Sequence, residues 1–337
     1  MKSFQYILLL FLACQLHAQI SDFDHIDFKK ADSIALSYGN EDLSNLPELS
    51  YKLTNHLTTD VERYRSIYRW VCANIKNDYG LYLKNKYKRE RFINDSVKFK
   101  AWNSAFRKRL FKKLTKHKRT ICTGYAYLVK KLTEFANLEC EIIQGYGRVS
   151  TTDIEGLTLP NHSWNAIKLN NKWYLSDPTW ASGIPDPKSN RFTFQYNDGF
   201  FLTNPKLFAI NHFPNESKWW LLEDTVPSFN DFLDAPIIYG KAYKNLEAHK
   251  LPKQFHHQLK TFEKIMFQYE IKTSVEDAKI HFLIDNGYNQ KKVQPTSKVV
   301  NAQLLTIEHQ FDKTGFYDVH FYIGEDLIST YTIEVTK

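Results

Sequence analysis

The sequence contains few of the residues that mark fibrous, low-complexity or disulfide-rich chains. Its 337 residues include only 12 glycines, 11 prolines and 4 cysteines, which excludes a collagen-like chain and a disulfide-dense mini-protein. After Gln19, no apolar run approaches the ~18 residues that a membrane-spanning helix needs. The whole sequence is 43% hydrophobic and 24% charged, which is an ordinary globular composition. The length predicts about two domains, each large enough to bury a core.

The first residues predict export. Lys2 precedes an apolar run from Tyr6 to Ala13 and a small residue at Ala18, the pattern of a secretory signal peptide over residues 1–19. Two alternatives remain for these residues. The protein could be a lipoprotein anchored through Cys14, or the apolar run could be a buried helix of the folded protein. We therefore expect a periplasmic or extracellular protein.

Three cysteines follow the predicted signal peptide, namely Cys72, Cys122 and Cys140. An odd number in an exported protein leaves at least one thiol unpaired within the chain. Cys72 and Cys140 fall on apolar patterns typical of buried thiols, although a disulfide between them stays open.

The excess of positive charge is concentrated in one segment. Residues 84–119 hold fifteen Lys and Arg against Glu90 and Asp95, a net +13, so the rest of the chain carries −5 of the total +8. Apolar residues at helical spacing predict an amphipathic helix with this charge on its outer face: Phe99, Trp102, Phe106, Leu110 and Leu114. The face is either merely solvated or attracted to an anionic partner such as a phospholipid, an acidic glycan or an acidic protein. No motif suggests nucleic acid.

The hydrophobic pattern divides the chain into an α+β part and an all-β part. Residues 20–79 show a helical pattern with a capping box at Thr59 and Glu62. A mixed pattern follows to about residue 225, which predicts one domain over residues 20–235. Beyond Pro252 the period becomes two. Together with a tyrosine corner at Tyr317, it predicts an immunoglobulin-like sandwich over residues 250–337.

Cys122 begins a stretch with helical spacing, where Leu128, Val129, Leu132 and Phe135 share one face. At the first turn of a helix, unpaired backbone N–H groups and the positive end of the dipole stabilise a thiolate. Because the thiolate is the nucleophilic form, this position suits a catalytic cysteine. A small buried packing residue is the alternative interpretation.

The residues around Asn170-Asn171 predict a β-hairpin, since two β-type runs flank this two-residue turn. If Leu169 pairs with Lys172, His162 and Asp177 project from one face of the sheet as diagonal neighbours about 7–8 Å apart. An imidazole and a carboxylate so placed can share a hydrogen bond. His162 would then act as a base towards Cys122, with Asp177 orienting its ring.

Three ordered motifs resemble one known family: Cys122-Thr-Gly-Tyr-Ala, His162-x-Trp-Asn and Trp173-Tyr-Leu-x-Asp177-Pro-Thr-Trp. They are similar to the transglutaminase-like superfamily, in particular to bacterial members related to kyphoscoliosis peptidase. The resemblance covers residues 48–228, with residues 84–119 as a basic helical insertion. It implies a papain-like core in which Cys122, His162 and Asp177 are nucleophile, base and orienting acid.

The resemblance also bears on the substrate cleft and on cofactors. The residues expected at the cleft are Tyr125, Asn161, Trp164, Trp180 and Trp102. Backbone N–H groups at the Cys122 helix would supply the first oxyanion donor, and Trp102 is a guess for the second. No acidic cluster resembles the calcium sites of animal transglutaminases, so we expect no metal and no cofactor.

Three functions follow as alternatives. The favoured one is hydrolysis of amide bonds in a protein or peptide substrate through a thioester intermediate. Acyl transfer to an amine, which forms a crosslink, shares that intermediate. A non-catalytic envelope binding or adaptor protein would keep the fold without the reaction. Nothing in the sequence fixes the substrate or the oligomeric state.

Overall fold

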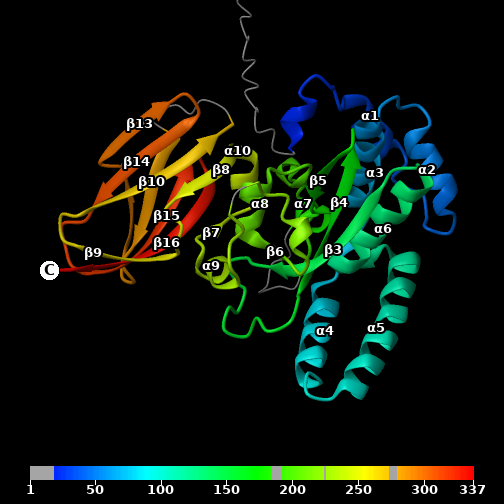
Figure 1. Cartoon of the computed structure of the whole chain (residues 1–337), viewed down its shortest axis with the longest axis horizontal. Coiled ribbons are helices and arrows are strands. Elements are labelled where there is room, and N and C mark those ends of the chain that lie inside the picture. The colour runs from blue at the N-terminus through cyan, green and yellow to red at the C-terminus, as the bar shows by residue number, and fades with distance from the viewer. Residues whose placement is uncertain (1–18, 184–190, 224, 273–278) are drawn as a thin grey trace, which may run out of the picture.

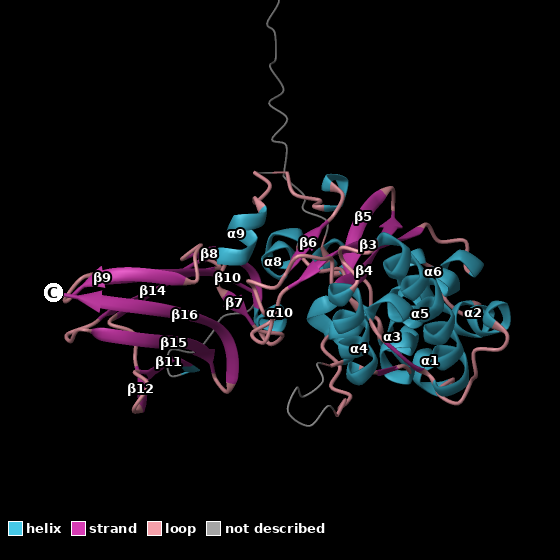
Figure 2. Ribbon diagram, turned by 90° about the horizontal axis from the view of Figure 1, so that it is seen from below, coloured by secondary structure: helices cyan, strands magenta, loops and turns pink. Residues whose placement is uncertain are grey.

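The computed structural model describes residues 19–183, 191–223, 225–272 and 279–337. The predicted signal peptide and Cys14 lie outside the described residues, except for Gln19. A helix-rich part and a strand-rich part occupy opposite ends of the molecule (Figures 1 and 2). Among the described residues, no helix combines the length and apolar character needed to cross a membrane.

The N-terminal residues form helices, as their periodicity predicts. Thr59 and Glu62 make the predicted capping box, in which each side chain bonds the other residue's backbone N–H. The helices are η1 (Ile20–Phe23), α1 (Lys29–Ser37), α2 (Leu46–Thr54) and α3 (Asp60–Asn74). The buried face of α3 packs against α6 (Cys122–Phe135), which joins these helices to the central sheet.

A four-stranded antiparallel sheet supports the centre of the helix-rich part. Its order is β5-β4-β3-β6, with β3 (Cys140–Gly147), β4 (His162–Leu169), β5 (Lys172–Ser176) and β6 (His212–Pro214). Leu169 pairs with Lys172, as predicted. Asn170 and Asn171 both have positive φ, the conformation that a two-residue hairpin turn requires.

The basic segment folds as two helices rather than the single amphipathic helix predicted. They are α4 (Tyr79–Arg91) and α5 (Ser96–His117), which form a hairpin that projects from the body (Figure 1). The break arises because the Asp95 side chain caps a new helix by accepting from the N–H of Lys98. At the base of the hairpin, β1 (Lys76–Asn77) pairs in parallel with β2 (Arg119–Thr120).

Short elements connect the sheet to the strand-rich part. They are α7 (Pro178–Ser182), η2 (Asp198–Phe200), α8 (Pro205–Asn211), η3 (Ser217–Trp219), α9 (Phe229–Asp234), β7 (Ile237–Ile238) and α10 (Ala242–Asn245). A buried arginine ties them to the N-terminal helices, because Arg65 of α3 binds both Asp32 of α1 and Asp198 of η2.

Two sheets pack face to face in the strand-rich part. One has the order β13-β14-β10-β8, and the other β12-β11-β15-β16-β7 with β9 beside β16. Their strands are β8 (Leu246–Leu251), β9 (His256–Lys260), β10 (Lys264–Ile271), β11 (Ile280–Asp285), β12 (Gln290–Val293), β13 (Ser297–Asn301), β14 (Leu304–Gln310), β15 (Gly315–Ile323) and β16 (Asp326–Thr336).

Aromatic side chains fill the space between these sheets. Tyr269 of β10 stacks on Phe321 of β15, with ring centroids 4.6 Å apart. The Tyr317 hydroxyl donates to the carbonyl of Lys313 at 3.0 Å, the contact expected of a tyrosine corner. Because β7 and β8 start before residue 250, the strand-rich part begins upstream of the predicted boundary. An α+β chain with an all-β end agrees with the prediction, and the immunoglobulin-like identity of that end stays a prediction.

Candidate active site

Cys122 is the first residue of α6 and lies just after the parallel β1–β2 pair. That pair fixes the backbone before the helix, since the N–H of Asp78 donates to the carbonyl of Thr120 at 2.7 Å. Position 124 requires glycine because there is no room for a side chain. A Cβ there would lie 1.9 Å from the Thr120 hydroxyl oxygen. The residue Cys122 is 6% exposed, and its Sγ lies 3.9 Å from the carbonyl oxygen of Asn161.

His162 and Asp177 form a buried hydrogen bond, with 2.7 Å between Nε2 and Oδ2. His162 begins β4, and Asp177 follows β5 and caps α7. The other carboxylate oxygen of Asp177 accepts from the N–H groups of Thr179 and Trp180 at 2.8 and 3.2 Å. The hairpin register therefore brings together the pair that the sequence predicts.

A second histidine, which sequence reasoning missed, binds the same carboxylate. His212 Nε2 lies 3.1 Å from Oδ2 of Asp177, and its Nδ1 lies 3.2 Å from the carbonyl oxygen of Phe208. The ring is fully buried and stacks on Phe208, with centroids 3.6 Å apart. The carboxylate of Asp177 thus takes part in four hydrogen bonds. The group that the structure shows directly is His162–Asp177–His212, with Cys122 beside it.

The two histidines have opposite protonation tendencies. Burial opposes the charged form of His162, but the charge and hydrogen bond of Asp177, together with the neighbouring Cys122 thiol, outweigh it and raise the pKa of His162 to about 10. Burial dominates at His212 and lowers its pKa to about 4 despite Asp177. Although burial opposes ionisation of Asp177, the charge of His162 and hydrogen bonds from both rings lower its pKa. At neutral pH this predicts a charged His162, a charged Asp177 and a neutral His212.

The three side chains have the spacing of a metal site, since their ligand atoms lie within 4.8 Å of one another. However, one oxygen of Asp177 already binds both rings and the other binds two backbone N–H groups. The side chains therefore satisfy one another without an ion, and we interpret the group as a hydrogen-bond network.

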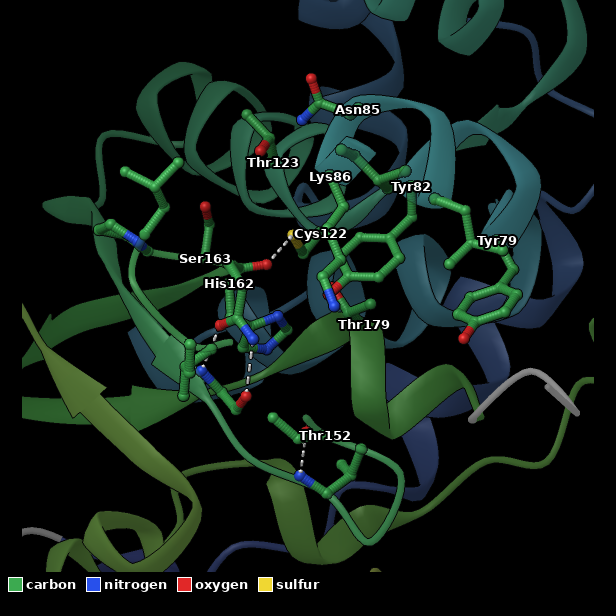
Figure 3. Close-up of a pocket in the computed structure, with 18 of the residues that line it drawn as sticks. Tyr79, Tyr82, Asn85, Lys86, Cys122, Thr123, Thr152, His162, Ser163 and Thr179 are labelled. Atoms are coloured by element: carbon green, nitrogen blue, oxygen red, sulfur yellow. Dashed lines mark hydrogen bonds between the residues drawn. The ribbon is translucent and has the colours of Figure 1, made fainter. Parts of the chain in front are cut away.

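Cys122 and His162 open onto one pocket, whose other walls come from α4 and from the segment before β4 (Figure 3). Of the predicted cleft residues, Asn161 and Trp180 line this pocket. The Asn161 amide is held by the backbone of Gly147, which both donates to it at 2.7 Å and accepts from it at 2.9 Å. The ring of Trp180 stacks on His162, with centroids 4.7 Å apart.

Three predicted cleft residues lie elsewhere. Tyr125 is fully buried in the core and donates to the carbonyl of Ile75 at 2.7 Å. Trp164 is 1% exposed and packs behind His162. Trp102 donates to the side chain of Asn85 at 3.0 Å, within the helix hairpin. Trp102 does not line the pocket and its indole N–H is already bound by Asn85, so the oxyanion role predicted for Trp102 gains no support.

Sequence reasoning also missed two residues of α4 that line the pocket, Tyr82 and Arg89. Burial and the nearby Cys122 raise the pKa of Tyr82 to about 12, so its hydroxyl stays a hydrogen-bond donor. No local sequence pattern indicates that these two residues lie near Cys122, because their position depends on how the α4–α5 hairpin packs against the rest of the protein. For His212 the only indication in the sequence is its place after the third motif, within the residues 48–228 that resemble the family.

Cys72 and Cys140 are free thiols buried away from the pocket. Burial raises the pKa of Cys140 to about 12 and places that of Cys72 well above its ordinary value. Both are therefore protonated at neutral pH, and the disulfide left open by the sequence is not formed. Since the nucleophilic form of a cysteine is the thiolate, neither of these thiols is poised to react.

Substitution of Gly147 by alanine is expected to displace His162. A Cβ at Gly147 would lie 2.9 Å from Cβ and 3.0 Å from Cγ of His162, too close for either to stay in place. We expect iodoacetamide to label Cys122 about tenfold more slowly, because sub-ångström displacements of paired groups have effects of this order. Gly39→Ala is the matched control, since its Cβ would make only ordinary contacts. Equal labelling rates in the two variants would contradict the prediction.

Comparison with known proteins identifies relatives for the helix-rich part. Residues 47–178 match the family model of the transglutaminase-like superfamily. Kyphoscoliosis peptidase from Homo sapiens is 33% identical over 184 residues, which is 53% of this chain and 25% of that protein. Hillarin from Drosophila melanogaster is 24% identical over 229 residues, or 64% of this chain and 25% of that protein. The chain thus matches only about a quarter of each relative's length.

Among solved structures, the similarities are too weak to assign a fold. The Lin-41 filamin domain matches with a TM-score of 0.19 and 7% identity, covering 23% of this chain and 82% of that one. Domain I81 from titin matches with a TM-score of 0.16 and 13% identity, covering 24% and 89%.

Proposed function

We propose that this chain, a member of the transglutaminase-like superfamily through residues 47–178, is an exported cysteine enzyme that acts on amide bonds of proteins or peptides. The observation that carries the proposal is the buried His162–Asp177 pair, with 2.7 Å between Nε2 and Oδ2, in the same pocket as a cysteine at a helix start. Export rests on the N-terminal sequence alone.

Each residue has a defined part in the proposed reaction. With Nε2 of His162 bound to Asp177, Nδ1 is the ring nitrogen left to hold the proton that Cys122 gives up. The proposed resting pair is therefore a thiolate and a charged ring. The sulfur attacks the amide carbonyl and forms a C–S bond. As the C–N bond breaks, His162 returns its proton to the leaving amine, which leaves a thioester on Cys122.

The thioester is then resolved by a second nucleophile. Water gives a carboxylic acid and restores the thiol, whereas a primary amine gives a new amide and a crosslink. The oxyanion formed at each stage would be bound by N–H groups at the start of α6. The Tyr82 hydroxyl is a further donor in the lining of the same pocket. We favour hydrolysis and retain acyl transfer as the alternative.

Selective alkylation tests the proposal. At pH 6, iodoacetamide is expected to label Cys122 at least about tenfold faster than Cys72 or Cys140, since only thiolates react and the latter two are held protonated. Peptide mapping by mass spectrometry assigns each site. Unfolding in urea is the control and should equalise the three rates. Equal rates in the folded protein would favour a non-catalytic adaptor.

A labelled primary amine separates the two enzymatic alternatives. Transfer predicts that the amine is incorporated into a glutamine-containing acceptor peptide and that Cys122→Ser abolishes this. Hydrolysis predicts release of ammonia or of a new peptide end without incorporation.

A further inference from the structure

Arg89 is a cation in the pocket wall without a carboxylate partner in the described part of the chain. It belongs to α4, which also brings Tyr82 and Lys86 to the pocket (Figure 3). Its guanidinium donates to the carbonyl of Pro160 at 2.8 Å and lies 5.6 Å from the centre of the Phe99 ring. One N–H is therefore used to hold the side chain in place, while most of its five donors remain for a ligand.

The groups that act on Arg89 belong to the site around Cys122. Burial lowers the pKa of Arg89, and the groups that oppose this effect are Cys122, Tyr82 and Tyr146, none of them a carboxylate. A guanidinium stays charged at neutral pH under any such shift. The pocket thus holds a half-buried fixed cation close to the nucleophile.

Each of the two acidic residues that line the pocket, Glu90 and Asp153, has a partner other than Arg89. Glu90 lies 3.8 Å from Lys86, and Asp153 accepts from the N–H of Gly156 at 3.1 Å. The hairpin around Arg89 adds a long-range positive field, because residues 84–119 carry a net +13. Both the local donors and the field favour a negatively charged ligand.

We infer that the pocket recognises a peptide carrying a carboxylate near the amide that Cys122 attacks, and that Arg89 binds this carboxylate. The inference rests on the proposed function and adds a substrate class to it. A planar guanidinium pairs with a carboxylate through two parallel hydrogen bonds, which fixes the orientation of the peptide as well as its affinity. The basic hairpin would raise the local concentration of acidic protein substrates.

A matched pair of affinity labels tests the inference without knowledge of the substrate. The probes are bromoacetyl-glutamic acid amide and bromoacetyl-glutaminamide, which alkylate a thiol by the same reaction and differ in one carboxylate against one carboxamide. The readout is the ratio of their second-order rate constants at Cys122. We expect the acidic probe to react faster with the unmodified protein, and Arg89→Gln to lower the ratio about tenfold.

The control variant is Arg107→Gln, which removes one exposed positive charge from α5, outside the pocket. We expect it to change the ratio less than about twofold, because exposed charges are screened by salt. An unchanged ratio in Arg89→Gln, or an equal fall in both variants, would overturn the assignment of Arg89. Slow labelling of Cys122 by both probes in the unmodified protein would instead contradict the proposed function. Circular dichroism verifies that each variant is folded.

Discussion

Replacing His162 with alanine is expected to slow the labelling of Cys122 by iodoacetamide at pH 6 by about a hundredfold or more. A positioned base contributes at least about 10²-fold to such proton transfers. In this protein the raised pKa of His162, about 10, keeps a positive charge beside Cys122 at mildly acid pH. Quenching the reaction at successive times, followed by peptide mass spectrometry, gives the labelling rate at each cysteine.

His256→Ala is the control for this substitution, because His256 is exposed on β9 in the strand-rich part. It is expected to leave the Cys122 rate unchanged. If His162→Ala labels as fast as the unmodified protein, His162 does not activate Cys122, and the triad fails even if Cys122 itself is reactive.

Replacing Asp177 with alanine is expected to lower the free energy of unfolding by about 3–5 kcal/mol, the usual cost of leaving one partner of a buried ion pair alone. The change leaves His162 without its partner and removes the acceptor for His212 and for two N–H groups at the start of α7. Urea unfolding followed by tryptophan fluorescence measures the change. Asp312→Ala is the exposed control, and equal midpoints in the two variants would refute the prediction.

The stabilisation by Asp177 should also depend on pH in a defined direction. Its pKa lies below the ordinary 3.8 in the folded state, so its contribution is present above 3.8 and is lost as the pH falls through the folded value. The pKa of His162 is raised from 6.5 to about 10, so its contribution is complete below 6.5 and is lost as the pH rises towards 10.

The difference in stability between the unmodified protein and Asp177→Ala should therefore be largest between about pH 4 and 6.5 and shrink on either side. His212 has a lowered pKa and costs stability as the pH falls from 6.5 towards 4. Because its ring is present in both proteins, this effect is largely removed from the difference. A difference that grows above pH 7 would contradict the assignment of a charged His162.

The parts of the site that could be predicted from sequence are those fixed by short-range geometry. Asn170-Asn171 sets a turn, the turn sets a register, and the register places His162 beside Asp177. The capping box of α3 is equally local. His212 could not be found this way, because its contact with Asp177 depends on the pairing of β6 with β3.

The cleft predictions for Tyr125 and Trp164 are wrong for one shared physical reason. Periodicity identifies an apolar face but does not say which neighbour covers it. Tyr125 and Trp164 therefore look like cleft residues in the sequence but are buried in the core. For Trp102 the cause is different, since one capping residue, Asp95, divides the basic segment and reverses its direction.

The pairing of β1 with β2 affects how this protein can evolve. It places the two ends of the α4–α5 hairpin next to each other, with Lys76 opposite Arg119 and Asn77 opposite Thr120. An insertion whose entry and exit are adjacent can lengthen, shorten or be exchanged without moving the backbone on which it is mounted. Selection could thus reshape one wall of the pocket while leaving Cys122 where it is.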